Sequence, residues 1–281
     1  MSQSPSTEFA GNDLSASISR KLVALRIFPI KGAHAVSIKE AVVTPIGLAD
    51  DRRYMVVDQN GLFQSQRKIP QMTQIEVALL LDGLQVQFPK LSRLFIPRGK
   101  TQAKMKVKVW ATEFEAWHID PAIDQWFSDA LHTNVKFVWM GDDCPRKIDS
   151  LFSDEDRSMN CADASPITLN NVQSLQAIAN SYPEKLPIDR FRNNITIDGT
   201  DAWEEESWQK VQIGSAKFKV LLPCGRCQVP SIDQETGKVP KNPIAVLETI
   251  RKVRNNGNFG IHMIPLETGI IALGNEIFPL N

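Results

Sequence analysis

Two cysteines and an arginine lie within four residues, in the stretch Cys224-Gly225-Arg226-Cys227. A thiolate is a soft metal ligand and a strong nucleophile, and a guanidinium beside it favours the deprotonated form. The glycine allows the backbone to bend, or to approach a ligand closely. We therefore expect this stretch to be a loop that carries chemistry.

Spacing alone leaves four interpretations of the two thiols open. The first is half of a structural zinc site, for which Cys144 and Cys161 have no matching spacing. The second is a redox dithiol, a motif that normally opens a helix, whereas Gln228-Val229-Pro230 is not a helix start. The third is one thiolate on a soft metal beside Arg226, and the fourth is two cysteines buried in a turn.

Basic residues recur where predicted strands of the first half begin or end, at Lys31, Arg52 and Arg67. Cations at strand ends can converge on one phosphate group, to which arginine offers a bidentate fork and lysine a point charge. Each of them taken alone is more commonly a solvated surface charge. The alternatives are therefore a shared anion site and an ordinary charged surface.

Two polar stretches in the second half offer further candidate ligands. Arg192 and Asn194 belong to a dense group of donors that would hold an extended polar cofactor or cap loops. Asp163 and Ser165 follow a polar segment, and Asp163 would form an Asx-turn or serve a site as acceptor or proton carrier. The four histidines show no metal-ligand spacing, so we expect structural or surface roles for them.

Composition restricts the class of protein. Lysine plus arginine and aspartate plus glutamate both number 32 in the 281 residues, which argues against nucleic acid or an anionic membrane as the main partner. Four cysteines without a disulfide pattern fit a reducing compartment, so we expect a cytoplasmic protein. No apolar run reaches the length of a membrane span.

Hydrophobic periodicity predicts a mostly β protein with a few helices, an α+β fold. Asn60-Gly61 and Asp82-Gly83 predict hairpins, and Pro223 is expected to end a strand because proline lacks an N–H. Strands are expected at 21–29, 36–43, 53–58, 63–67, 74–81, 84–88, 105–110, 114–119, 135–140, 194–197, 211–213, 216–222, 261–264 and 269–273. Helices are expected at 121–132, 171–180 and 243–254, the first with Asp120 as its N-cap.

The same signals divide the chain into four segments. Residues 1–20 are serine-rich and predict a flexible tail, and residues 21–110 predict a β domain. Residues 111–160 predict a connecting segment with a helix and a mobile loop, and residues 161–281 a second, mainly β domain.

An ordered set of motifs resembles a known family. The first half resembles the N-terminal β-barrel domain that accompanies MOSC domains, in Phe28-Pro29-Ile30-Lys31-Gly32 and in Gly47-Leu48-x-x-Asp51-Arg52-Arg53-Tyr54-Met55-Val56. The second half resembles the MOSC β-barrel domain, in Asp163-Ala164-Ser165-Pro166, Phe191-Arg192-x-Asn194-Ile195 and Cys224-x-Arg226-Cys227-x-x-x-x-x-Asp233-x-x-Thr236-Gly237. The pattern is similar to the mitochondrial amidoxime reducing component and to bacterial YcbX-type proteins.

The resemblance implies a bound molybdenum cofactor, Mo-molybdopterin. It implies that Cys227 ligates the metal and that Cys227 and Asp163 are catalytic, with Lys31 and Arg52 on the pterin phosphate. The full set of cofactor contacts that it implies is Lys31, Arg52, Arg67, Ser165, Arg192, Asn194 and Arg226. The chain departs from the family at Gly225, where a serine is common, and at Asn193, where a proline is common.

The activity implied is reduction of N-hydroxylated compounds by electrons from a separate donor protein carrying flavin, iron–sulfur or haem. No Rossmann glycine fingerprint or iron–sulfur cysteine set occurs in the sequence. The alternative is a carrier of the cofactor, or of sulfur on Cys227, without turnover of its own. Pyridoxal phosphate binding is a further family-level implication.

Overall fold

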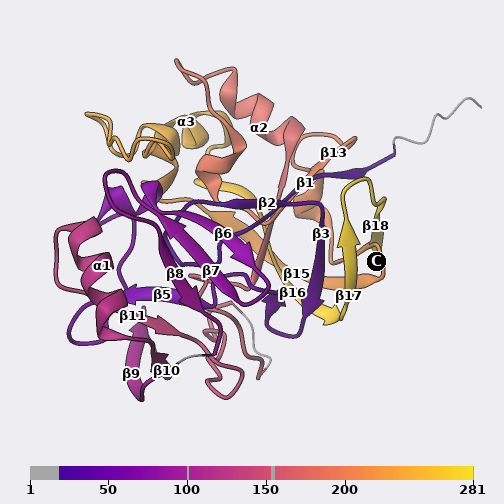
Figure 1. The fold of residues 1–281 in the computed structure, drawn as a ribbon. Helices are drawn as coiled ribbons and strands as arrows, with labels where there is room; N and C mark the ends of the chain where they lie inside the picture. Colours follow the sequence, from indigo (N-terminus) through magenta and orange to yellow (C-terminus); the bar gives the residue numbers. More distant parts are fainter. Residues whose placement is uncertain (1–18, 100, 153–155, 281) are drawn as a thin grey trace, which may run out of the picture.

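The computed structural model describes residues 19–99, 101–152 and 156–280, which form four β-sheets (Figure 1). The largest sheet has the order β18-β14-β15-β16-β12-β13-β1-β2, with all neighbours antiparallel except β12 and β13. Its strands are β1 (Lys21–Ile27), β2 (Val36–Ile38), β12 (Ile167–Asn171), β13 (Ile195–Asp198), β14 (Lys210–Ile213), β15 (Ala216–Gly225), β16 (Asn258–Glu267) and β18 (Ile277–Leu280).

Three smaller sheets complete the β structure. The order β5-β11-β10-β9 joins β5 (Tyr54–Val57), β11 (Lys136–Trp139), β10 (Thr112–His118) and β9 (Lys104–Val109). The order β17-β3-β4 joins β17 (Gly269–Ala272), β3 (Glu40–Thr44) and β4 (Gly47–Leu48). The order β6-β7-β8 joins β6 (Glu76–Leu80), β7 (Gly83–Gln87) and β8 (Leu94–Pro97). The prediction of a mostly β, α+β fold is confirmed.

Three short α-helices lie outside the sheets, and their starts follow sequence signals. Helix α1 (Pro121–Leu131) begins after Asp120, whose carboxylate accepts the Ala122 N–H, and α2 (Val172–Ala179) begins after the N-cap Asn171. Helix α3 is Ala245–Arg254, and four 3-10 helices are η1 (Pro70–Gln74), η2 (Ile188–Phe191), η3 (Glu204–Ser207) and η4 (Val229–Ser231). None of the helices in the described residues is long and apolar enough to cross a membrane.

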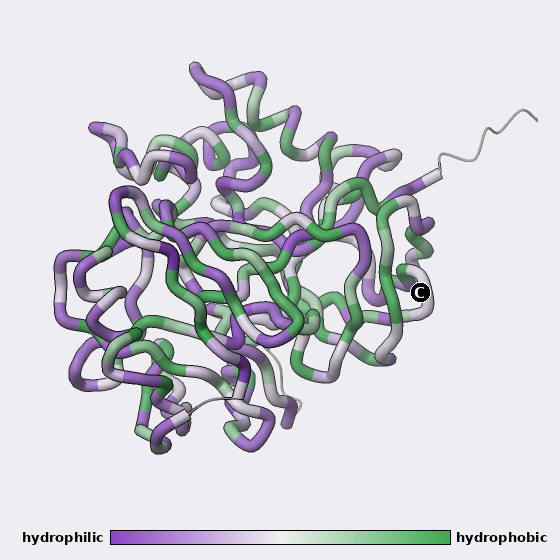
Figure 2. The backbone as a smooth tube through the Cα atoms, in the orientation of Figure 1, coloured by the Kyte–Doolittle hydropathy of each residue, from purple (hydrophilic) through white to green (hydrophobic). Residues whose placement is uncertain are grey.

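The N-terminal strands cross into the C-terminal part of the fold. Strand β1 pairs with β13 and β3 pairs with β17, so indigo strands lie among orange and yellow ones in Figure 1. Apolar side chains from these strands and from β12, β14, β15 and β16 share one buried cluster, and the strands carry the long green stretches of Figure 2. Burial of these apolar side chains holds the N-terminal and C-terminal strands together, because apolar burial is the dominant favourable contribution to folding.

Some sequence expectations are wrong in detail. Strand β15 continues through Pro223 to Gly225, because register shifts on both sides of Pro223 remove the need for a ladder N–H at that residue. Residues 63–67 form no strand beyond an isolated bridge at Phe63, and the chain turns away, which leaves Arg67 on a loop. Strands β4, β8, β12 and β18 lie outside the expected ranges.

The described residues include only parts of the predicted tail and of the predicted mobile loop. The predicted tail falls outside the described residues up to residue 18, and the segment 141–160 contains no helix or strand in its described part. The predicted domain boundaries stay a prediction, since strands from 21–48 pair into C-terminal sheets.

Gly260 in β16 supplies a test of the fold, with Gly99 as its control. Both have φ of +74°, but a Cβ at Gly260 would lie 2.4 Å from the Leu169 carbonyl oxygen, whereas Gly99 has nothing within 4 Å. We expect Gly99→Ala to cost about 1–2 kcal/mol from the left-handed backbone alone. Gly260→Ala should cost clearly more in urea unfolding, and equal costs would contradict the close β12–β16 approach.

Candidate functional site

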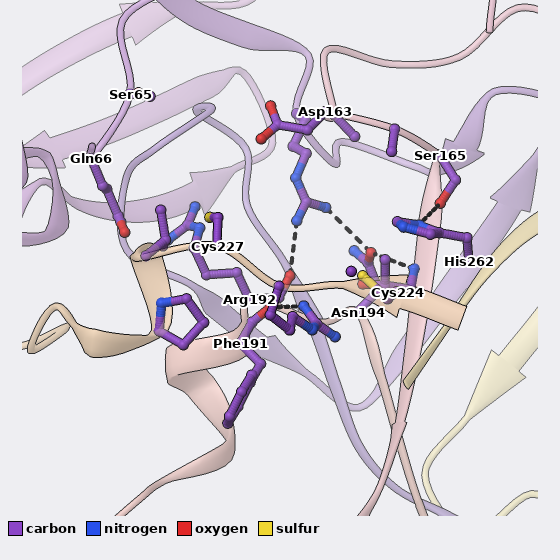
Figure 3. Close-up of a pocket in the computed structure, with 18 of the residues that line it drawn as sticks. Ser65, Gln66, Asp163, Ser165, Phe191, Arg192, Asn194, Cys224, Cys227 and His262 are labelled. Carbon is purple, nitrogen blue, oxygen red and sulfur yellow. Dashed lines mark hydrogen bonds between the residues drawn. The ribbon is translucent and has the colours of Figure 1, made fainter. Parts of the chain in front are cut away.

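One cavity of about 540 Å³ collects residues from distant parts of the chain. It lies where the turn after β1, the 65–67 loop, the 162–165 segment, the loop after η2 and the end of β15 meet, with one face formed by β16 (Figure 3). All nine predicted site residues line it, namely Lys31, Arg52, Arg67, Asp163, Ser165, Arg192, Asn194, Arg226 and Cys227. Their roles toward a cofactor stay predictions.

The lining of this cavity is strongly cationic. Among the described lining residues, Asp163 is the one carboxylate, against the six cations Lys31, Arg52, Arg67, Arg190, Arg192 and Arg226. A concave surface of one sign of charge, with low-dielectric walls, concentrates ions of the opposite sign. The cavity therefore favours an anionic ligand.

Two of these cations share one aromatic ring. The guanidinium carbons of Arg52 and Arg192 lie 4.5 and 4.3 Å from the centre of the Phe28 ring. Arg52 is fixed by Asp51 at 2.6 Å and donates to the Arg192 carbonyl at 2.9 Å. Burial, and then Arg52, lower the pKa of Arg192 to about 9, so an anion bound here would be stabilised by both charges and would offset their repulsion.

The backbone of both arginines is also unusual. Arg52 and Arg192 have φ of 48° and 54°, in the left-handed region that residues with a Cβ rarely adopt. Such a conformation persists only where the surrounding structure fixes it, and it concentrates at functional sites. The strain is consistent with two cations held in place for a ligand.

Lys31 and Arg67 are held by the one carboxylate. The Lys31 ammonium donates to Asp163 and, at 2.8 Å, to the Cys161 carbonyl, while Arg67 reaches Asp163 at 3.1 Å. Burial raises the pKa of Asp163, but Lys31 and Arg67 outweigh it and hold that pKa well below its usual range. Asp163 is thus a fixed anion that positions two cations at the mouth of the cavity.

The two thiols of the motif have different neighbours. Cys227 is half-buried and faces Arg67, whereas Cys224, within β15, is buried. We expected the Arg226 charge to favour the thiolate form of Cys227, but the structure gives Arg226 other neighbours. Its guanidinium donates to the Phe191 and Phe259 carbonyls, at 3.0 and 2.8 Å, and its charge acts on Cys224.

His262 is a site residue that the sequence did not reveal. Its Nδ1 lies 2.8 Å from the Ser165 hydroxyl oxygen, and it lines the cavity together with the Cys224 thiol. Burial raises the pKa of Cys224, but Arg226 and His262 together bring it down to about 7. Only the pairing of β15 with β16, which no local spacing encodes, brings this histidine to the motif.

Two other interpretations of the thiols, a structural zinc site and a redox dithiol at a helix start, find no support in the geometry. Cys144 and Cys161 belong to a separate apolar cluster, so they do not complete a zinc site with Cys224 and Cys227. Within the part of the chain that the structure describes, no three His, Cys, Asp or Glu side chains gather as a metal site. The expectation that the whole stretch is a loop is wrong, because Cys224 and Gly225 are the last residues of β15, and the chain then leads only into the three-residue η4.

Comparison with family models defines the class of protein. Residues 19–134 match the MOSC N-terminal beta barrel domain and residues 156–278 match the MOSC domain. The chain therefore belongs to the MOSC-domain proteins and carries both domains in that order.

Curated relatives extend the similarity over most of the chain. Mitochondrial amidoxime-reducing component 1 of Homo sapiens is 28% identical over 278 residues, 91% of this chain and 82% of the relative. Mitochondrial amidoxime reducing component 2 of Bos taurus is 26% identical, with the same coverage of both chains. Molybdenum cofactor sulfurase of Drosophila melanogaster is 28% identical over 88% of this chain, which spans 32% of that relative.

The solved YUAD protein from Bacillus subtilis aligns with a TM-score of 0.45 at 13% identity, over 92% of this chain and 94% of the other.

The charge of Asp163 predicts a pH-dependent contribution to stability. Because its pKa is lowered in the fold, the contribution is complete above the unfolded value of about 3.9 and is lost as the pH falls toward the folded value. Asp163→Asn should cost about 1–2 kcal/mol at pH 7, since the carboxylate is partly exposed. Urea unfolding of the cofactor-free protein should show a smaller gap between variant and wild type at pH 3, and a constant gap would contradict the ion-pair assignment.

Proposed function

We propose that this protein binds the molybdenum cofactor in the cationic cavity and reduces N-hydroxylated compounds with electrons from a separate donor protein. The observation that carries the proposal is the excess of six cations over one carboxylate around an accessible thiol. The relatives named as amidoxime reducing components support the reaction, and those named as molybdenum cofactor sulfurase support the cofactor.

The residues present fit an anionic, soft-metal cofactor. Arg52 and Arg192 on Phe28, together with Lys31, would hold a phosphate, because guanidinium and ammonium donors match its oxygens. Cys227, half-buried and facing Arg67, would supply the thiolate ligand. The bound cofactor would provide the two-electron chemistry of molybdenum, which no side chain supplies.

The protein's own contribution is positioning and charge. Asp163 fixes Lys31 and Arg67, and Asn194 fixes Arg52 by accepting its N–H at 3.3 Å. These groups are set before a ligand arrives, so binding requires little reorganisation. Each removal of an N–O oxygen consumes two electrons and two protons, which an electron-donor protein with flavin, iron–sulfur or haem would match. A cytoplasmic location and pyridoxal phosphate binding stay predictions.

Cys227→Ser tests the metal ligand. A hydroxyl is a harder donor than a thiolate and stays protonated near neutral pH, so we expect molybdenum-dependent reduction to be abolished. The measurement is reduction of a hydroxylamine-type substrate by an artificial reductant, in protein made in a host that synthesises the cofactor.

Cys144→Ser is the matched control, because Cys144 is a buried thiol that does not line the cavity. It should cost about 0.5–3 kcal/mol of stability and leave the activity per chain of folded protein unchanged. Full activity in Cys227→Ser would contradict the proposal. Wild-type protein that retains molybdenum but does not turn over would favour the alternative, a carrier of the cofactor or of sulfur.

Arg192→Gln tests the cationic cradle. Loss of one charged donor to an anion typically costs about 1.5–3 kcal/mol, so we expect roughly tenfold or greater weakening of cofactor retention. Molybdenum and phosphate per chain after gel filtration are the measurements.

Arg254→Gln is a suitable control for it, since Arg254 also lies over an aromatic ring, 3.9 Å from the centre of Trp203, and pairs with Glu206. It should lower stability without loss of molybdenum. Equal retention in Arg192→Gln and wild type would exclude this arginine from the cofactor site.

A further inference from the structure

Three buried polar groups lie together at one side of the cavity. Cys224, His262 and the Ser165 hydroxyl are 5%, 7% and 3% exposed, and all three line the cavity. In Figure 3 a dashed line joins Ser165 to His262, and Cys224 lies on the His262 side while Cys227 lies on the Gln66 side. The proposed function assigns phosphate binding to Arg52 and Arg192 and metal binding to Cys227. It assigns no role to Cys224.

The hydrogen bonds define the tautomer of the histidine. The Ser165 hydroxyl donates its one hydrogen to the Ile167 carbonyl at 2.9 Å, so it accepts from His262 Nδ1 at 2.8 Å. The Nδ1 atom therefore carries the ring hydrogen, and Nε2 is the nitrogen able to accept a proton. Ser165 thus orients His262 as a base, and Cys224 is the thiol that lies on the same side of the cavity.

Several charged groups face the Cys224 thiol. They are Arg226 directly after β15, His262 from β16 and Asp163 from the 162–165 segment. Burial and Asp163 raise the pKa of the thiol, but Arg226 and His262 bring it to about 7. A group that titrates near neutral pH can both give up a proton and take one back in each turnover. Neither proton transfer then has a large free-energy cost.

We propose that Cys224, oriented by His262 and Ser165, is the acid that delivers a proton to the departing oxygen during N–O reduction. This inference rests on the proposed function. In the balanced reaction R–NH–OH gains two electrons from the donor protein and two protons, the N–O bond breaks, and R–NH₂ and water form. Cys224 gives one proton to the oxygen, a proton taken up from solvent goes to nitrogen, and His262 returns a second solvent proton to the thiolate, so that two protons are taken up in each turnover.

The first test measures the thiol in cofactor-free protein, where activity plays no part. In a Cys227→Ser background, Cys224 is the one thiol lining the cavity, and peptide mapping after iodoacetamide treatment follows it. His262→Asn leaves only Arg226 to oppose burial, so the pKa of the thiol should rise toward its ordinary value near 8.5, at which only a few per cent is ionised at pH 7. We therefore expect this alkylation at pH 7 to be slowed by roughly tenfold. Ser165→Ala should slow it by a smaller factor.

His132→Asn is the matched control, since His132 is exposed at the C-cap of α1, away from the cavity. It should alkylate at the wild-type rate. An unchanged rate in His262→Asn, with a native circular dichroism spectrum in all variants, would overturn the proposal.

The second test uses the cofactor-loaded protein with an intact Cys227. His262→Asn and Cys224→Ala should lower kcat by about 10²-fold at unchanged molybdenum content and nearly unchanged KM, the size typical of general acid catalysis. Unchanged kcat in both variants would overturn the role in proton delivery, even if alkylation is slowed. Wild-type protein that holds molybdenum and reduces nothing would refute the proposed function itself, while the alkylation rates would still decide whether His262 activates Cys224.

Discussion

Arg52 and Arg192 share the ring of Phe28, and the rest of the site depends on this crowding of like charges. Neither guanidinium can move away, because Arg52 is bonded to Asp51 and to the Arg192 carbonyl, and Arg192 donates to the Ala33 carbonyl at 2.8 Å. The ring offers both a cation–π contact, but it supplies no counter-charge. An anion bound between them would be stabilised by charges that folding has already placed.

The sheet topology explains how these charges come together. Phe28 and Lys31 follow β1, which pairs with β13 directly after the Arg192–Asn194 turn. The strand that carries the thiols, β15, pairs with β16, which carries His262. One eight-stranded sheet therefore positions both the arginine side and the thiol side of the cavity.

The sequence allowed the mostly β fold, helix α1 with its Asp120 cap, and the set of cations to be predicted, because each depends on local periodicity, capping or a motif. It did not show that His262 lines the cavity or that two arginines share the ring of Phe28, because both depend on strand pairing between distant segments. The partner of Arg226 was misjudged for the same reason: its neighbour in sequence is Cys227, but its guanidinium turns toward β16 and Cys224. Pro223 misled in a different way, since a bulge accommodates a proline that would otherwise end a strand.

The central claim is that the cationic cavity and Cys227 together hold a molybdenum-containing anion. Metal analysis of wild-type protein purified from a host that makes the cofactor, beside protein from a host unable to make it, tests this claim most directly. The account predicts molybdenum approaching one atom per chain in the first preparation and none in the second, with zinc absent from both. Zinc in the first preparation, or molybdenum-free protein from a host that synthesises the cofactor, would contradict it.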